Sequence, residues 1–134
     1  MALNSKSIEA QIATLLDDYS KEVKEKTDKA FEQVAKEAAQ ELRQTSPRGK
    51  GKNSGDYAKG WTVKRERDKK SGLYTITVHN KTHYQLTHLL ENGHDVVRGG
   101  VVVGHAKAYP HIADVNDWAI QAFESELYRR LKEK

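Results

Sequence analysis

Six histidines are the residues of this 134-residue chain best suited to chemistry, and five of them lie between positions 83 and 111. His83 and His88 are five positions apart, about 140° around a helix, so they do not share a face. His88 and Glu91 are three apart and could share one. Loops are expected to carry the other three: His94, His105 and His111. The sequence has neither an HExxH pattern nor a cysteine, so we expect surface or hydrogen-bonded histidines, no metal site and no cofactor.

Nucleophilic catalysis is not indicated either. There is no Gly-x-Ser-x-Gly elbow, and serine, histidine and aspartate co-occur by chance in a polar chain. Glu91 or Asp114 could become an acid or base if buried. Glu91 is better placed to cap a helix or to pair with Arg98 or Lys107. We therefore expect no enzyme.

Composition bounds the class of protein. A chain of 134 residues fits one domain spanning 1–134, and 37% hydrophobic with 31% charged residues suits long exposed helices or a subunit completed by neighbours. The absence of cysteine excludes disulfides. The N-terminus has no apolar signal core and no segment approaches a membrane span, so neither an export signal nor a membrane segment is expected. The net charge of +4 permits nucleic-acid contact without requiring it.

The N-terminal third predicts one long helix over 1–44. From Ile8 to Leu42 the apolar residues recur in steps of three and four. Such a helix is on the order of 60 Å long at ~1.5 Å per residue, longer than a small domain can cover. Asn4 or Ser5 can cap its start, and Ser46-Pro47 ends it. The second half should pack on a sheet, while the first half projects as a candidate subunit contact through Ile8, Ile12, Leu15 and Tyr19.

The segment 45–60, TSPRGKGKNSGDYAKG, is expected to be a flexible basic loop that buries nothing. It is not a P-loop, because no Gly-Lys-Ser/Thr follows a buried strand. Two interpretations stay open: a solvated linker, or a loop that contacts phosphates or a protein partner. The candidate contact residues are Arg48, Lys50, Lys52 and Lys59.

Residues 61–134 predict a small sheet and two helices. Trp61–Glu66 alternates apolar and polar residues, a turn follows at 68–72, and Leu73–His79 alternates again, which is the pattern of a β-hairpin. Val101–Val103 is expected to form a third strand, with Gly99-Gly100 and Gly104 as hinges.

Two helices complete the expected α+β fold. A short middle helix should stop at Gly93 in the left-handed conformation. After Pro110 an amphipathic C-terminal helix should pack on the mostly antiparallel sheet of three to four strands, with Trp118 as its anchor. The long N-terminal helix is the third helix of this fold.

The order of several blocks resembles the HK97 gp10-like family of tailed-phage neck proteins. Tyr84 is followed by Leu90-Glu91-Asn92-Gly93, and after a variable loop by Ala108-Tyr109-Pro110-His111-Ile112. An upstream segment at 55–61, GDYAKGW, resembles a further family block. Histidine stands at 111, where the family prefers an aromatic residue.

This resemblance implies a structural virion component of a tailed phage or prophage. Such a neck or tail-completion (head–tail joining) protein forms a ring between the head connector and the tail tube. It would be assembled in the bacterial host cytoplasm and contact neighbouring neck and tail proteins, with passing DNA a further candidate partner. The alternative is a small basic nucleic-acid-binding module, using Tyr57 and Trp61 for stacking and the basic group Lys64, Arg65, Arg67, Lys69 and Lys70. A histidine-dependent metallohydrolase is a third hypothesis.

Two apolar surfaces predict a homo-oligomeric ring. The arm from Val96 to Gly104 is apolar, rich in glycine, and offers a strand edge that can pair with another chain. Together with the projecting half of the first helix it suggests head-to-tail contacts that close into a ring. The arm residues expected at the interface are Val96, Val97, Val101, Val102 and Val103.

Overall fold

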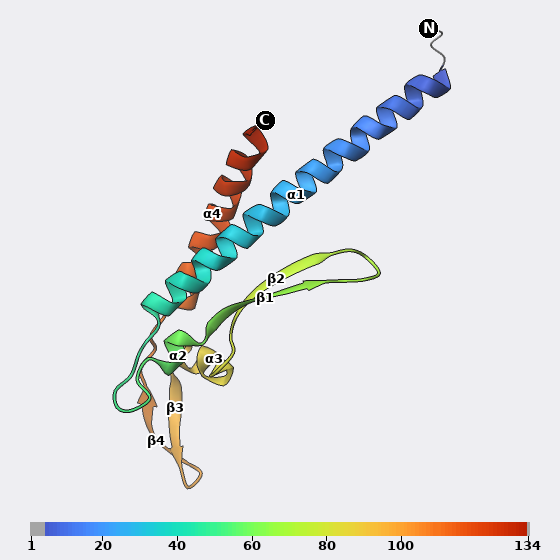
Figure 1. Ribbon diagram of the computed structural model, residues 1–134. Helices are drawn as coiled ribbons and strands as arrows, with labels where there is room; N and C mark the ends of the chain where they lie inside the picture. Colours follow the sequence, from blue (N-terminus) through green and yellow to red (C-terminus); the bar gives the residue numbers. More distant parts are fainter. Residues whose placement is uncertain (1–4, 134) are drawn as a thin grey trace.

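The computed structural model describes residues 5–133, with side chains from residue 8 onward, and shows an α+β fold (Figure 1). The elements in order are α1 (Ser5–Thr45), α2 (Asp56–Lys59), β1 (Trp61–Arg67), β2 (Tyr74–Asn80), the 3-10 helix η1 (Tyr84–Leu86), α3 (Thr87–Asn92), β3 (His94–Arg98), β4 (Val101–Ala106) and α4 (Ile112–Lys132). The long first helix, the four antiparallel strands, the short middle helix and the C-terminal helix are therefore confirmed. Asn4, one of the two candidate caps, lies outside the described residues.

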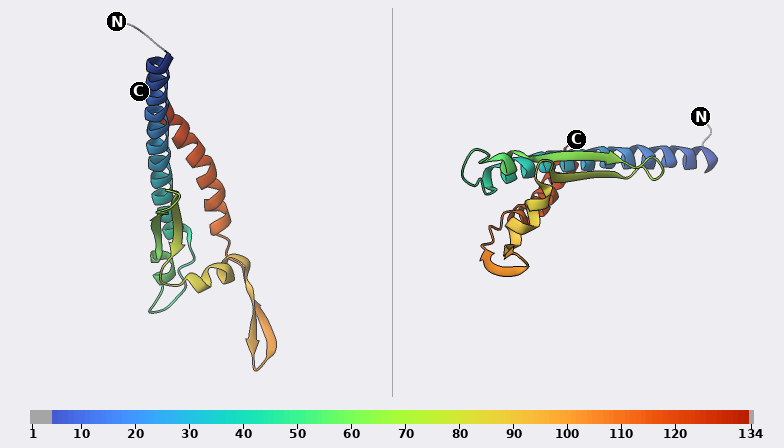
Figure 2. Two further views of the ribbon diagram at one scale, coloured as in Figure 1. Left: turned by 90° about the vertical axis from the view of Figure 1, so that its right-hand side faces the viewer. Right: turned by 90° about the horizontal axis from the view of Figure 1, so that it is seen from below.

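Helix α1 is the element on which the rest of the chain packs. Its C-terminal half lies against α4 on one side and the β1–β2 hairpin on another (Figures 1 and 2). Small residues on this half, such as Ala30 and Ala39, are completely buried, because a short side chain lets a neighbouring element approach closely. The helix ends at Thr45, where Ser46-Pro47 was expected to end it.

The β1–β2 hairpin is the predicted one, and its half-buried face turns toward α1. The strands pair in register with Val63 opposite Val78. Tyr74, Ile76 and Val78 are half-buried and alternate with exposed threonines. Polar contacts also join the hairpin to α1. Arg65 makes a bidentate contact with Glu32 of α1, and Arg67 lies 3.3 Å from a carboxylate oxygen of Asp28.

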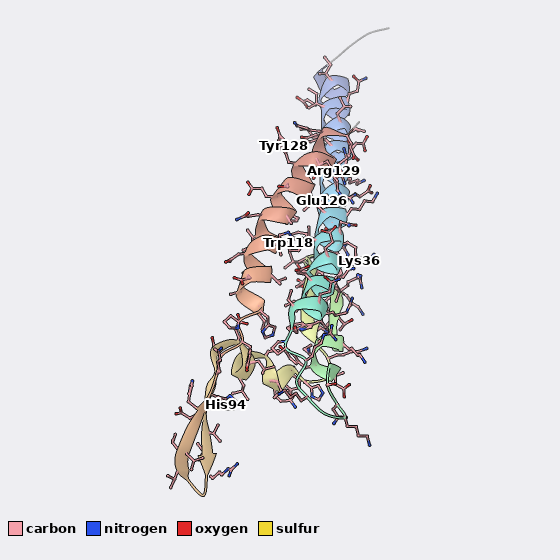
Figure 3. All side chains as sticks on the ribbon, turned by 90° about the vertical axis from the view of Figure 1, so that its left-hand side faces the viewer. Lys36, His94, Trp118, Glu126, Tyr128 and Arg129 are labelled. Atoms are coloured by element: carbon pink, nitrogen blue, oxygen red, sulfur yellow. The ribbon has the colours of Figure 1, made fainter. Side chains whose placement is uncertain are left out.

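Helix α4 packs along α1, and the prediction that it packs on a sheet anchored by Trp118 is wrong. Phe123 of α4 stacks on Phe31 of α1 with ring centroids 4.1 Å apart. The side chain of Trp118 lies on α4 as Figure 3 shows. It is 41% exposed, whereas that of Val115, one turn earlier, is 6% exposed. The physical reason is that α1 already covers the β1–β2 hairpin, so the apolar stripe of α1 is the surface left for α4.

The strands form two separate two-stranded sheets, which corrects the expectation of one sheet of three to four strands. The strand expected at Val101–Val103 exists as β4, but its partner is β3, with a bulge between Val96 and Val97. Gly99 and Gly100 make the turn with positive φ angles of 58° and 78°. Gly104 is not a hinge, since it pairs with Val96 inside β4.

The prediction that segment 45–60 buries nothing is also wrong. Residues 56–59 form the short helix α2, whose Tyr57 and Ala58 are buried at 7% and 0% exposure. Tyr57 joins Trp61, Leu42, Ala38 and Val115 in the main apolar cluster of the molecule. Residues 48–54 are exposed, and the flexibility of that part stays a prediction.

Candidate functional site

A buried polar junction joins α2, α3 and the start of α4. The Tyr57 hydroxyl lies 2.8 Å from Nε2 of His111, and Nδ1 of the same ring lies 2.6 Å from the Tyr109 carbonyl. A carbonyl only accepts, so Nδ1 donates to it, and in a neutral ring Nε2 then accepts from the tyrosine. Burial, reinforced by the charge of Glu91, raises the pKa of Tyr57 to about 12, so Tyr57 keeps the proton that it donates.

Glu91 caps α4 from a different helix. One of its carboxylate oxygens accepts from the backbone N–H of His111 at 2.7 Å and of Ile112 at 2.8 Å, and the other accepts from Ala113 at 2.9 Å. These are N–H groups that a helix start leaves without an intrahelical partner. Burial by itself raises the pKa of Glu91, but the three N–H donors together outweigh it and hold the pKa below its ordinary value. The sequence-based expectation that Glu91 caps a helix is thus confirmed.

Asn80, 1% exposed, is the second polar centre of the junction. Its side-chain N–H donates to the Tyr57 carbonyl at 2.7 Å, while its oxygen accepts from the backbone N–H of His83 at 2.9 Å. Gly60 is required beside it, because a Cβ there would lie 2.5 Å from the Asn80 side-chain oxygen and 2.1 Å from the Thr82 hydroxyl. No sequence pattern indicated this cluster.

Gly93 ends α3 as expected, but not in the left-handed helical conformation. Its φ of 74° is positive, while its ψ of 175° is extended, a combination open essentially to glycine alone. A Cβ there would also lie 2.7 Å from the Ala106 carbonyl. The glycine therefore sets the direction in which the β3–β4 hairpin leaves the body.

The polar groups of the junction are hydrogen-bonded to one another and join the elements around it. The buried indole N–H of Trp61 is also satisfied, by the Ser46 hydroxyl at 2.8 Å. Within residues 5–133 no three His, Cys, Asp or Glu side chains gather closely enough to hold a metal ion. Among the described buried side-chain atoms, Nδ1 of His94, at the base of the β3–β4 hairpin (Figure 3), has no hydrogen-bond partner.

A groove of about 950 Å³ lies next to the junction, between the basic loop, α3 and the segment before α4. Leu86, Leu90, Tyr109 and Pro110 contribute apolar surface, and Tyr57 reaches it from below. Two cations of the loop, Arg48 and Lys50, and Lys107 of the segment before α4 also line it. No sequence pattern indicated this groove, because its walls come from segments some 60 residues apart.

The side chains expected at subunit interfaces are mostly exposed. In the hairpin, Val97, Val101, Val102 and Val103 are 57–62% exposed, and Val96 is half-buried. On α1 the exposure runs from 42% at Ile8 to 68% at Leu15, with Ile12 and Tyr19 between these values. The hairpin and the start of α1 project from opposite ends of the body (Figure 2). The structure does not bring the two sets together within one chain.

The residues expected to bind nucleic acid do not form one exposed surface, because several are buried or paired with carboxylates. Tyr57 and Trp61, expected to stack on bases, are both buried. Arg65 and Arg67 contact carboxylates of α1, and Lys64 lies 2.7 Å from Glu66. The loop residues Arg48, Lys50, Lys52 and Lys59 are exposed, and no salt bridge in the described part of the chain involves them.

The fold and the junction define a small α+β protein whose buried polar groups join its elements and whose apolar residues project on two extensions. Residues 10–93 match the family described as "Bacteriophage HK97-gp10, putative tail-component", and the chain belongs to this family. It is therefore a tail component of a bacteriophage by family, and a part of the virion.

Further comparisons add no relative. No curated protein and no solved structure matches the chain. None of the helices in residues 5–133 combines the length and the apolar character that crossing a membrane requires.

Proposed function

We propose that this chain is a neck or tail-completion subunit that forms a homo-oligomeric ring between the head connector and the tail tube. The observation that carries the proposal is the β3–β4 hairpin, which projects from the body (Figure 1). Its two-stranded sheet carries exposed valines. An isolated two-stranded hairpin is marginally stable in water. Contact with a neighbouring chain would cover its valines and complete its open strand edges.

The second projecting surface is the N-terminal half of α1. Lys26 of α1 donates a hydrogen bond to the backbone carbonyl of Glu133 at 2.7 Å, so the end of α4 meets α1 at this point. The apolar residues Ile8, Ile12, Leu15 and Tyr19 lie beyond that point. Two different surfaces at opposite ends of one chain favour head-to-tail contacts, and such contacts form a ring when the rotation between subunits closes.

A subunit of this kind works by complementary surfaces and needs no turnover. The virion partners are then the neck and tail proteins above and below the ring, and the exposed loop with Arg48, Lys50, Lys52 and Lys59 is proposed to face a protein partner. The geometry favours this over the nucleic-acid alternative, because the two aromatic residues that would stack on bases are buried.

Deleting the gene from the phage or prophage that encodes the chain tests the function. The proposal expects DNA-filled heads and tails that accumulate unjoined, with joining restored when the wild-type chain is supplied in trans. Joined infectious particles formed without the chain would rule the function out. Tails that fail to form at all would place the chain within the tail tube instead.

A further inference from the structure

The groove beside the buried junction has the size and lining of a site for one side of an amphipathic helix. Apolar surface comes from Leu86 of η1, Leu90 of α3 and the segment before α4, and the mostly polar segment 45–56 supplies half of the lining residues. The cations that line the groove, called its rim below, are Arg48, Lys50 and Lys107. Asp56 is the acidic residue among those that line it. A helix that fits must therefore present an apolar stripe flanked by carboxylates.

The N-terminal half of α1 presents such a stripe. Ile8, Ile12, Leu15 and Tyr19 follow one another at intervals of four, three and four, which places them on one face of the helix. They are 42–68% exposed, and no other element of the described chain reaches this part of α1 (Figure 1).

Charge on this half of α1 complements the groove. Between Ile8 and Ser20 the sequence holds three carboxylates and no lysine or arginine. Glu9 and Asp18 lie on either side of the apolar stripe, each roughly 80–100° around the helix from Ile8. Asp17 lies on the opposite face, where it pairs with Lys21 at 3.0 Å.

The groove cannot be filled by the helix of the same chain. The groove-lining loop follows the C-terminal end of α1, and the stripe occupies the N-terminal end of the same straight helix (Figure 1). About 30 residues of helix separate them, or roughly 45 Å at ~1.5 Å per residue. This stripe can therefore reach such a groove only in another copy of the chain.

We propose that the stripe Ile8–Tyr19 of one chain docks in the basic-rimmed groove of the next chain. This inference rests on the proposed ring and specifies one of its contacts, namely which surface receives the N-terminal half of α1. The β3–β4 hairpin is a poorer occupant, because its exposed tip carries Arg98 and valines and no carboxylate to match the rim.

Disulfide trapping tests the contact, since the chain has no native cysteine. Gln11→Cys lies beside the stripe, and Ser54→Cys lines the groove and is nearly isosteric. The two full-length single-cysteine variants are mixed and oxidised. The disulfide between them should form about tenfold or more faster than in a control mixture, because docking raises the local concentration of the two thiols. The control replaces Ser54→Cys with Ser125→Cys, on exposed α4 surface away from the groove.

Sedimentation velocity on the same samples separates failure of the contact from failure of the ring. Oligomers that trap the Gln11→Cys/Ser54→Cys pair support the inference. Oligomers without that cross-link overturn it and leave the proposed ring intact. Chains that stay monomeric at every concentration and trap no pair overturn both.

A charge exchange supplies an independent arm of the test. Asp18→Lys and Lys50→Glu should each slow formation of the disulfide between the cysteine pair. Placing the two changes on opposite partners should restore the rate. Both the slowing and the restoration should be smaller at high salt, which screens the charges. Slowing by each single variant with no restoration in the exchanged pair would contradict docking of this stripe in this groove. Circular dichroism of each variant verifies the fold.

Discussion

The hydroxyl of Tyr57 lies 2.8 Å from Nε2 of His111, and this contact links the short helix before β1 to the start of the last helix, 54 residues along the chain. Both side chains are buried, Tyr57 at 7% and His111 at 4% exposure. The family resemblance expects an aromatic residue at 111. Histidine keeps a flat ring there, stacked edge-on to Tyr57 and Trp61, and adds a hydrogen bond.

Tyr57→Phe should lower the free energy of unfolding by about 1–3 kcal/mol, because it leaves Nε2 of a buried histidine without a donor. Urea denaturation of the full-length protein measures the change. The control is Tyr84→Phe, at a side chain that is 72% exposed, where the effect should stay within about 0.5 kcal/mol. Equal, small effects of both substitutions would show that the Tyr57–His111 bond adds little.

Glu91→Gln should lower stability by about 1 kcal/mol near neutral pH, because it removes the charge from the cap of α4. The pKa of Glu91 is lower in the folded than in the unfolded chain, so its stabilisation is complete above the ordinary value of 4.5 and is lost as the pH falls through the lower folded value. The urea midpoint of the wild type should therefore fall more steeply below pH 4.5 than that of Glu91→Gln. Parallel curves for the two proteins would argue against the cap. Glu124→Gln, at an exposed position on α4, is the control.

Gly60→Ala should destabilise the protein by about 1–3 kcal/mol for steric reasons alone. Its φ of −76° is accessible to any residue, but the new Cβ would overlap the Thr82 hydroxyl and the Asn80 side chain. Gly104→Ala is the matched control, since nothing lies within 4 Å of the Cβ position there. A thermal melt in which the two variants behave alike would place Asn80 outside a tightly packed junction.

Binding to duplex DNA should be absent or weak at physiological salt. If the loop met DNA through Arg48, Lys50, Lys52 and Lys59, log K would fall with log salt at a slope of about −3 to −4. A gel shift with salt titration measures this slope. A stable shift with that slope, lost on replacing the four cations by glutamine, would revive the nucleic-acid alternative.

Local patterns predicted the elements of this fold better than their arrangement. Apolar residues recur in steps of three and four along α1 and alternate at Tyr74, Ile76 and Val78 of β2. Each pattern indicates which face of its element turns inward, and both the helix and the strand are present. Strand β3 was not foreseen, because its five residues, HDVVR, do not alternate between apolar and polar side chains. The packing of α4 depends on which surface the other elements leave uncovered, which no local pattern encodes.

The polar junction was largely hidden for a similar reason. The capping role of Glu91 was foreseen, but the N–H groups that it caps lie 20–22 residues further along the chain. Asn80 lies at the end of a strand, in a stretch of sequence without a distinctive motif. Its role depends on the chain segments that the fold brings around it. The groove is of the same kind: the cations of its rim were noted in the sequence, but not its apolar wall.

Val102→Asp should abolish self-association and leave the fold of the free subunit unchanged, because Val102 is 58% exposed on the projecting hairpin. Circular dichroism and thermal melting check the fold, and sedimentation velocity reports association. Gln121→Asp, at an exposed position on α4, controls for the added charge. If Val102→Asp unfolds by itself, the hairpin belongs to the core of the subunit.

Imaging of virions tests the central claim most directly. Electron micrographs of particles assembled with a C-terminally labelled chain should show the label as one ring at the junction of head and tail. Particles assembled with Val102→Asp as the sole copy should lack the label and remain unjoined. Label distributed along the tail tube, or joined and labelled particles with Val102→Asp, would contradict the account.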